Sequence, residues 1–460
     1  MNKNILCAIL LLIPANVMAS GLFLAPQGVR PLSRGGAFVA GADDVNAMTY
    51  NPAGISEAKN GGLIDLTLPI HTTTYQRWRE GQVNDTYYPS VEGKGLGLPS
   101  PTIGGVYGFA RFPQLKFGAS ASAPVPLMQN WPSTVDGRAA PQRYAIENFK
   151  GTALLKTQLA IAYTPHRMIS LGAAFTLMAG LFESQMTASG CDGVTCSNPE
   201  NPLTDVAIQI KSNLIMAPGA HLGIILRPLP WLRLGASWES AYRVNVGAKF
   251  NVRLPESDAY SGAVLNPSTP KGKIAFELPQ VARVGIEFRF LKDNLRWETT
   301  YVWENWAAHD QIKIGLGGAV ISNIIGLGQY AMRDVVLDRG FKNSWSIRTG
   351  AEWSPTTYNW TRGLTLRAGF MYEPTAIPNA KLTAMNVDLD KFLATAGLTY
   401  QWRKWFVQAS YAHVFMVDRT VTSSSIYQTN PTDYANRTPI GNGTYSSTAD
   451  IVGLGLGMYL

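Results

Sequence analysis

Residues beyond about position 60 alternate apolar and polar side chains with a period of two. The pattern is clearest at residues 169–181, 345–353 and 364–373. In 345–353 one face carries Trp345, Ile347, Ala351 and Trp353, and the other carries Ser346, Arg348, Gly350 and Glu352. A period of two is that of a β-strand, whose successive side chains point to opposite faces. Water is a poor partner for a face built of Trp and Ile, so the alternation predicts strands with one side in lipid.

The connections between these segments fall into two classes. Short connections occur at residues 113–114, 165–167, 228–230, 292–294 and 403–404. Long irregular segments occur at residues 80–100, 125–148, 190–205, 255–271, 315–344, 375–389 and 422–443. Short turns at one rim and long loops at the other are typical of outer-membrane barrels. We therefore expect an all-β protein, a transmembrane antiparallel β-barrel.

Composition favours the same class. Charged residues make up 15% of the chain, which also contains 12 Trp, 19 Tyr and 17 Phe. No segment after residue 20 has roughly 18 consecutive apolar residues, so we expect no transmembrane helix. The formal net charge of +8 suits contact with outer-membrane lipid and the phosphates of lipopolysaccharide. No basic cluster is interleaved with aromatic residues, so we expect no nucleic-acid partner.

The first 19 residues predict a secretory signal peptide. Lys3 supplies the positive charge, residues 5–13 form an apolar core, and Ala19 ends a small-residue cleavage site. The apolar core is too short to span a bilayer. The mature chain is therefore expected outside the cytoplasm.

Two cysteines remain after removal of the signal, Cys191 and Cys196. In an exported chain, one close pair predicts a disulfide that closes a small loop. A metal site is the alternative, but two thiols without a nearby histidine make a poor zinc site.

No motif for catalysis or cofactor binding is present. The five histidines are scattered, with no His-x-x-x-His spacing for a metal. The chain has no Gly-x-Ser-x-Gly elbow and no phosphate-binding Gly-Lys-Ser or Gly-Lys-Thr. We therefore expect a protein that is not an enzyme and has no cofactor and no metal.

Residues 20–56 form a segment rich in small residues that lacks the strand alternation. It contains Ser33-Arg34-Gly35-Gly36-Ala37, then Ala40-Gly41-Ala42-Asp43-Asp44, then Tyr50-Asn51-Pro52-Ala53-Gly54. In this order and spacing, the segment resembles the N-terminal hatch of the outer-membrane long-chain fatty acid transporter family, which also contains aromatic-hydrocarbon uptake channels. The alternative is a flexible linker ahead of a barrel.

The resemblance implies a monomeric barrel of about 14 strands with a short hatch, or plug, inside its lumen. We expect a signal peptide at 1–19, a hatch at 20–60 and the barrel at 61–460. The implied function is diffusion-driven uptake of hydrophobic compounds, such as long-chain fatty acids, with lateral release through the barrel wall. The implied partner is a hydrophobic small-molecule ligand. The hatch motif residues are Arg34, Gly35, Gly36, Asp43, Asp44, Asn51, Pro52, Ala53 and Gly54.

The third strand of the family carries a kink that opens a gap in the barrel wall. The matching segment here begins near Leu115, and Gly118, Ser120 and Ser122 are the small-residue candidates for a lateral opening. Pro124 and Pro126 follow, and proline lacks a donor for a β-ladder. The alternative is that Pro124 only ends the strand at the membrane surface.

The apolar residues Leu22, Phe23 and Leu24 at the start of the mature chain are the candidates for ligand binding inside the barrel. Burial of each such side chain contributes about 1.5–3 kcal/mol. The alternative is plain packing against the barrel wall.

Charged residues recur on the polar faces of consecutive strands. We expect them to pair across strands and to seat the hatch, because isolated dry charges would cost several kcal/mol. A second possibility is that one arginine receives a ligand carboxylate, and the sequence does not select which one. These residues are Glu239, Arg243, Arg283, Glu287, Arg289, Arg296, Glu298, Glu304, Arg348, Glu352, Arg367 and Glu373.

Three other functions stay open at this stage. An aromatic-hydrocarbon channel of the same family differs only in its substrate. An open porin for polar solutes would need an unobstructed lumen. An outer-membrane hydrolase would need a cluster of acid, base and nucleophile at the outer rim, and no such cluster is visible in the sequence.

Overall fold

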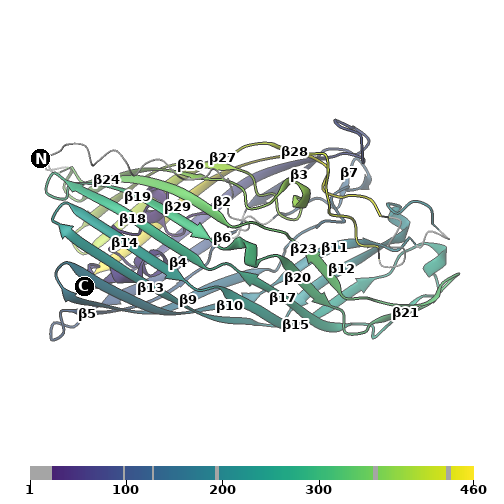
Figure 1. Cartoon of the computed structure of the whole chain (residues 1–460), viewed down its shortest axis with the longest axis horizontal. Helices are drawn as coiled ribbons and strands as arrows, with labels where there is room; N and C mark the ends of the chain where they lie inside the picture. Colours follow the sequence, from purple (N-terminus) through teal and green to yellow (C-terminus); the bar gives the residue numbers. More distant parts are fainter. Residues whose placement is uncertain (1–22, 97–98, 127–128, 192–195, 356–360, 431–436) are drawn as a thin grey trace, which may run out of the picture.

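The computed structural model describes residues 23–96, 99–126, 129–191, 196–355, 361–430 and 437–460 (Figure 1). Its main sheet has 16 strands, of which β3 (Val91–Leu96) and β28 (Arg419–Val421) only extend the rim. The other fourteen close into an antiparallel barrel, because β29 pairs with β2 along its whole length. The predicted barrel of about 14 strands is therefore confirmed. Its strands are β2 (Gly61–Arg77), β4 (Ser100–Tyr107), β5 (Leu115–Ser122), β9 (Ala153–His166), β10 (Ile169–Leu181), β13 (Ile215–Leu229), β14 (Leu232–Glu239), β18 (Val281–Phe290), β19 (Leu295–Glu304), β24 (Ser344–Trp353), β25 (Leu364–Glu373), β26 (Lys391–Trp402), β27 (Trp405–Met416) and β29 (Gly443–Tyr459).

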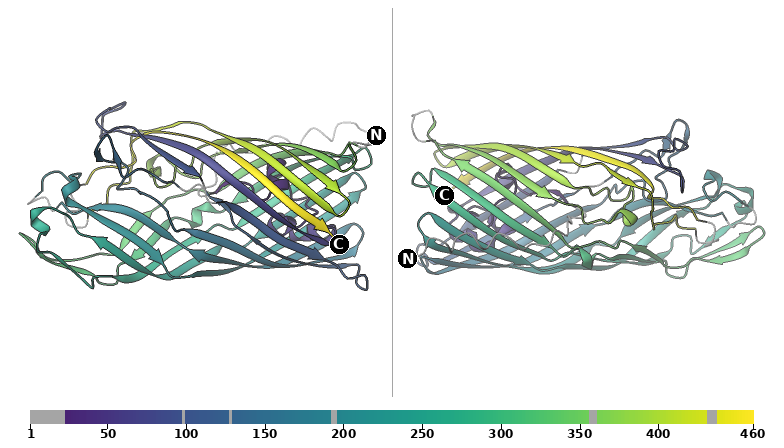
Figure 2. Two further views of the ribbon diagram at one scale, coloured as in Figure 1. Left: turned by 180° about the vertical axis from the view of Figure 1, so that it is seen from behind. Right: turned by 45° about the horizontal axis from the view of Figure 1, so that its top comes forward.

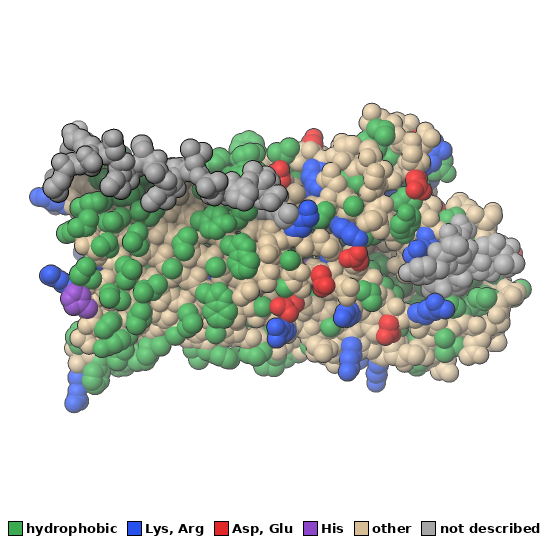
Figure 3. All heavy atoms as spheres, in the orientation of Figure 1, with side chains coloured by type: hydrophobic (Ala, Val, Ile, Leu, Met, Phe, Trp, Pro, Cys, Tyr) green, Lys and Arg blue, Asp and Glu red, His purple; other side chains and the backbone are tan. Residues whose placement is uncertain are grey.

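The period-two pattern determines which face of each strand points outward. The strand predicted at residues 169–181 is β10, in which Leu171 and Phe175 are exposed while Ser170 and Thr176 are fully buried. On the face drawn in Figure 3, apolar side chains cover the half of the barrel near the C-terminus, and charged side chains gather over the other half. This apolar band is the surface that a bilayer would cover. No helix in the described part of the chain is long and apolar enough to cross a membrane.

The barrel is extended at one end by a second sheet (Figure 1). The sequence predicted irregular segments at residues 190–205, 255–271 and 315–344 of this region, and of the six strands only β23 lies inside one of them. The six strands pair because their inward faces share an apolar core around Ile210, Phe250 and Ile274. This extension sheet consists of β11 (Glu183–Ser189), β12 (Asp205–Ser212), β15 (Tyr242–Arg253), β17 (Lys271–Leu278), β20 (Gln311–Gly315) and β23 (Val335–Asp338).

Short elements complete the rim beyond the extension sheet. β16 (Val264–Asn266), β21 (Val320–Ile324) and β22 (Gly328–Ala331) form a small sheet, and β7 (Thr134–Val135) pairs with β8 (Arg138–Ala139). The 3-10 turns are η2 (Pro202–Thr204), η3 (Asp258–Tyr260), η4 (Trp306–Ala308) and η6 (Asn379–Lys381).

Residues 23–60 lie inside the barrel at the end that carries the C-terminus (Figure 2). They form β1 (Phe23–Ala25), α1 (Val29–Ser33), α2 (Ala47–Tyr50) and the 3-10 turn η1 (Pro52–Ser56). Apolar side chains such as Phe38, Met48 and Ile55 are fully buried in a core shared with the barrel wall. We call this segment the hatch from here on.

Candidate functional site

The hatch is held to the wall by buried ion pairs. Arg34 is fully buried, and its Nη2 lies 3.2 Å from Glu287 Oε2 and 3.0 Å from Glu298 Oε2. The Glu298 carboxylate also accepts hydrogen bonds from the backbone N–H groups of three consecutive hatch residues, Val39, Ala40 and Gly41. One wall carboxylate therefore binds both an arginine and a backbone turn of the hatch.

A second cluster joins Asp43 and Asp44 to the wall through Arg30. Arg30 Nη1 lies 2.6 Å from Asp43 and 3.1 Å from Asp44, and Arg30 Nε lies 3.0 Å from Glu352. Arg296 from β19 pairs with Asp43 at 2.8 Å. The aspartate pair of the hatch motif thus faces arginines on both the hatch and the wall.

The Asn51-Pro52 turn is built by the asparagine side chain. Asn51 Oδ1 accepts a hydrogen bond from Ala53 N–H at 3.2 Å, and Asn51 Nδ2 donates to the carbonyl oxygens of Val39 and Ile224. Pro52 is suited to the first position of the following turn, where its missing N–H costs nothing. Gly54 packs so closely on the backbone of Ala42 that a Cβ would overlap the Ala42 carbonyl oxygen.

Gly35 and Gly36 both adopt a left-handed backbone, with φ of 62° and 82°. Residues other than glycine rarely adopt this conformation, so the pair lets the chain leave α1 in a tight turn. Gly35 N–H then donates to Thr395 Oγ1 on β26 at 3.0 Å. The sequence-predicted hatch motif residues therefore lie together in one segment packed against the wall.

The candidates for a lateral opening lie in a fully paired strand. Within β5, Gly118, Ser120 and Ser122 pair with β4 on one side and β9 on the other. The pairing with β9 stops at Ser122, which lies opposite Lys156. The wall is therefore continuous at these three residues, and the pairing between β5 and β9 ends immediately after Ser122.

Beyond Ser122 the chain turns into the barrel. Ala123 N–H donates to the Pro101 carbonyl at 2.9 Å, and β6 (Val125–Pro126) then pairs with β1 of the hatch instead of with the wall. Among the described residues, positions 153–155 of β9 consequently pair only with β10. The two prolines noted in the sequence lie where the strand leaves the ladder, as the missing N–H donor requires.

An apolar cavity of about 650 Å³ lies at this point of the wall. Its lining includes Pro101 and Pro124 at the strand ends and side chains exposed on the outer surface, such as Leu155. It also includes side chains buried inside the protein, such as Ile274 and Leu278. The cavity therefore reaches from the lipid-facing surface to the interior, and its size is typical of small-molecule sites.

A smaller hatch cavity of about 130 Å³ lies beside the start of the hatch. Leu24 lines it and packs on Leu32, Met371 and Leu393. Leu22 lies outside the described residues, as does the signal segment 1–19, and Phe23 is described through its backbone pairing with Pro126. The sequence-predicted Leu24 thus contacts both the wall and a cavity.

The charged groups that line the hatch cavity form ion pairs, except Glu304, which accepts a hydrogen bond from Trp306 Nε1. Lys156 and Arg283 both bind Glu239, at 2.8 and 3.2 Å, and Arg348 lies 3.3 Å from Glu373. One residue of the predicted charge ladder was misplaced, because Arg243 lies on the outward face of β15 and its side chain is 83% exposed. β15 belongs to the extension sheet, where the polar face points to water.

Three cavities follow one another through the molecule. An outer cavity of about 480 Å³ lies among the long loops, and it shares Leu337, Arg339 and Met385 with the apolar cavity. The apolar cavity in turn shares Pro124 and Leu278 with the hatch cavity. The three cavities therefore adjoin one another from the outer rim toward the hatch.

Sequence reasoning missed Arg339 and His309. Both line the apolar cavity, and both are buried. Desolvation by burial lowers the pKa of Arg339 to about 10, and burial together with the Arg339 charge lowers the pKa of His309 to about 3. Both residues lie at the ends of segments without strand alternation, so no sequence signal marked them.

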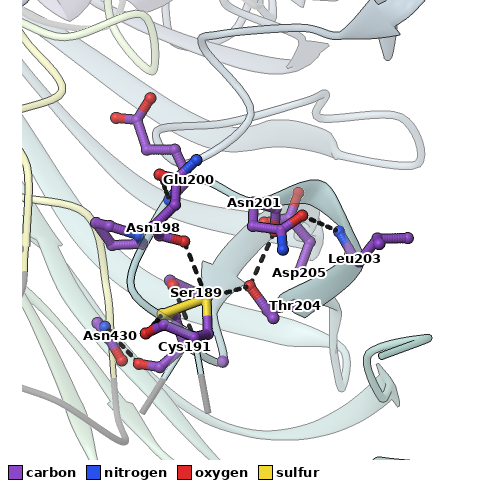
Figure 4. Close-up of a disulfide and its surroundings, with 12 residues drawn as sticks. Ser189, Cys191, Asn198, Glu200, Asn201, Leu203, Thr204, Asp205 and Asn430 are labelled. Atoms are coloured by element: carbon purple, nitrogen blue, oxygen red, sulfur yellow. Dashed lines mark hydrogen bonds between the residues drawn. A yellow bond between two sulfur atoms is a disulfide. The ribbon is translucent and has the colours of Figure 1, made fainter. Parts of the chain in front are cut away.

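Cys191 and Cys196 form a disulfide in the described structure, with Cα atoms 5.1 Å apart (Figure 4). The bridge lies beside the last long loop, because Asn430 Nδ2 donates to the Cys191 carbonyl at 3.0 Å. Residues 192–195 between the cysteines lie outside the described residues.

Comparison with known proteins identifies several similar structures. A FadL homologue from Pseudomonas aeruginosa is 14% identical, with 96% of this chain and 100% of that chain covered and a TM-score of 0.74. The toluene transporter TodX of Pseudomonas putida is 15% identical, with 95% and 99% covered and a TM-score of 0.65. The toluene transporter TbuX of Ralstonia pickettii is 15% identical, with 95% and 99% covered and a TM-score of 0.60. No curated protein matches the sequence.

At such low identity, these structures bear on the fold alone. The family model described as "Outer membrane protein transport protein (OMPP1/FadL/TodX)" matches residues 10–458, nearly the whole chain. The chain therefore belongs to this family of outer-membrane transport proteins, and it is a β-barrel of the outer membrane.

Proposed function

We propose that this protein takes up hydrophobic compounds by diffusion, with long-chain fatty acids or similar lipids as substrates, and releases them sideways into the bilayer. The observation that carries this proposal is the apolar cavity at the end of β5, which reaches both the interior and the lipid-facing surface. The opening in our proposal lies at Ala123 and Pro124, directly after Gly118, Ser120 and Ser122.

The physical need for such a path is simple. Apolar solutes are poorly solvated by water, so a water-filled pore gives them no advantage. A cavity lined by Leu, Ile, Phe and Pro side chains removes their surface from water at about 25 cal/mol per Å². Release through the wall would let the solute reach lipid without crossing water again.

The proposed exit can be narrowed by one substitution. Ala123→Trp places a large ring at the cavity wall, whereas Ala119→Trp places the same ring on the lipid-facing side of β5, four residues earlier. We expect Ala123→Trp to reduce uptake of a labelled long-chain fatty acid by at least about tenfold in cells that lack their own channel. Ala119→Trp serves as the control and should transport normally.

Both variants must first show the heat-dependent gel shift of a folded barrel. Equal uptake by Ala123→Trp and Ala119→Trp would contradict the proposed lateral exit. If the unmodified protein takes up no apolar compound, the proposed uptake function is wrong.

A second candidate substrate is an aromatic hydrocarbon. Two of the similar structures carry the description of toluene transporters, and the apolar cavity contains Phe149, Phe182 and Phe276. Competition between toluene and a long-chain fatty acid for uptake would separate the two substrates. An open porin is disfavoured because the hatch lies inside the barrel, and swelling of liposomes in sugars would reveal one.

A further inference from the structure

Arg339 differs from the other buried arginines of this chain. Arg34, Arg296 and Arg367 each lie within 3.0 Å of a glutamate oxygen. Arg339 is 7% exposed, yet no carboxylate in the described ranges forms an ion pair with it. Its Nη1 contacts the Met385 sulfur at 2.9 Å, its Nη2 bonds the Asn386 amide oxygen, and its Nε has no hydrogen-bond partner among the described residues.

A buried charge without a counter-ion is costly to hold. The lowered pKa of about 10 reflects this cost, but the guanidinium stays charged at neutral pH. Arg339 is also the one charged residue in the described lining of the apolar cavity. The described lining of the cavity therefore holds a single positive charge, and no described carboxylate neutralises it.

His309 does not add a second charge. Its Nδ1 lies 2.7 Å from the Glu277 carbonyl oxygen, so this nitrogen is the donor and Nε2 carries the lone pair. Its pKa of about 3, lowered by burial and then by the Arg339 charge, keeps the ring neutral at physiological pH. The same aromatic ring orders both residues, since Phe341 lies 4.8 Å from the Arg339 guanidinium and 5.4 Å from the His309 ring.

We propose that Arg339 binds the carboxylate of an amphiphile whose hydrocarbon chain lies in the apolar cavity. This inference rests on the proposed uptake function and names its substrate class, a long-chain monocarboxylate in preference to an uncharged hydrocarbon. One carboxylate neutralises the one charge of the cavity, and a guanidinium offers it two parallel N–H donors. Arg339 also borders the outer cavity, so the anion meets it on arrival from the loops.

The test compares hexadecanoate with hexadecanol, which has the same chain length but no charge. Equilibrium binding of both is measured to the purified unmodified protein, Arg339→Gln and Arg333→Gln. Arg333 is the matched control, because it lines the outer cavity, is exposed and lies outside the apolar cavity. We expect Arg339→Gln to lower the affinity for hexadecanoate by about tenfold or more and to change the affinity for hexadecanol by less than about threefold.

The carboxylate site would be overturned if Arg339→Gln lowered the affinity for both ligands equally, or if it left the affinity for hexadecanoate unchanged. If the unmodified protein binds hexadecanol without any preference for hexadecanoate, the inference fails and the uptake function stands. If it binds neither ligand, the proposed function fails as well.

A second measurement needs only the unmodified protein. The titration of carboxyl-labelled hexadecanoate is followed by carbon NMR in the bound state and in detergent micelles. A neighbouring guanidinium favours the ionised form, so the bound carboxyl should titrate at lower pH than the micellar one. A bound carboxyl that titrates at the same or higher pH would contradict the site, even if Arg339→Gln did not fold.

Discussion

Glu298 shows how much of the hatch depends on single residues of the wall. One carboxylate accepts N–H groups from Val39, Ala40 and Gly41, and it also pairs with Arg34. Because the site is fully buried, each of these donors would otherwise face no acceptor. The carboxylate thus converts a backbone turn without regular structure into a fixed part of the barrel interior.

We expect Glu298→Gln to loosen the hatch at this turn. The amide keeps the shape of the side chain but replaces one acceptor oxygen with a donor and leaves Arg34 with less counter-charge. Disruption of a buried pair costs about 3–5 kcal/mol, whereas an exposed pair is worth about 0–1 kcal/mol. Amide hydrogen exchange at positions 39–41 should therefore accelerate strongly in Glu298→Gln.

The control is Glu277→Gln, which removes the partner of the exposed Arg243 on the extension sheet. Its hatch amides should exchange as in the unmodified protein. Unchanged protection at positions 39–41 in Glu298→Gln would show that the carboxylate is not the anchor.

At the same scale, sequence reasoning succeeded where chemistry is local. Asn51 forms its turn with Ala53, two residues away, as an Asn-Pro pair predicts. It did not select Arg339, because this residue is distinguished by its three-dimensional surroundings, in which no described carboxylate forms an ion pair with it. Arg243 was misplaced for a related reason: the same alternation describes a lumen-facing residue in the barrel and a water-facing one in the extension.

Among the elements, the departure of β5 from the wall is the event on which the proposed route depends. β5 ends at Ser122, and the next paired residues join the hatch strand β1. The sequence indicated a weak strand through small residues and prolines. It did not show that the chain turns inward, because a β-ladder joins residues far apart in sequence, such as Phe23 and Pro126.

The extension sheet marks a second limit of sequence reasoning. Two of its strands, β20 and β23, and the strands β16, β21 and β22 of the neighbouring small sheet have only three to five residues, too few for a period of two to stand out from irregular sequence. By contrast, the strands predicted at 169–181 and 364–373 agree with β10 and β25 at both ends. Long strands with lipid on one face are predictable, and short strands that cap the rim are not.

The disulfide belongs to this scale, because it constrains one loop element. We expect Cys191→Ser with Cys196→Ser to cost about 2 kcal/mol of local stability, the chain-entropy value for a loop of this length. Limited proteolysis of residues 189–205 should accelerate, whereas the heat-dependent gel shift of the barrel should stay unchanged. Labelling of two free thiols in the unreduced protein would contradict the pairing.

For the whole molecule, the barrel and the hatch are separable in their hydrogen bonding. The barrel closes through the pairing of β2 with β29, and none of its described ladder bonds requires residues 23–60 apart from the β6 contact with β1. The hatch instead fills the lumen and neutralises wall charges such as Glu287 and Arg296. Its loss should therefore leave a barrel with an open, charged interior.

We expect deletion of residues 20–60, with the signal peptide retained, to give a folded barrel that leaks small polar solutes. The unmasked lumen carries Glu287, Glu298, Arg296 and Arg367, whose charges would then be hydrated and would line a water-filled passage. Single-channel conductance in planar bilayers should rise well above that of the unmodified protein, and the heat-dependent gel shift should persist. Uptake of fatty acid should lose its dependence on Ala123, because the solute no longer needs the side route. A conductance equal to that of the unmodified protein would show that the hatch does not close the barrel.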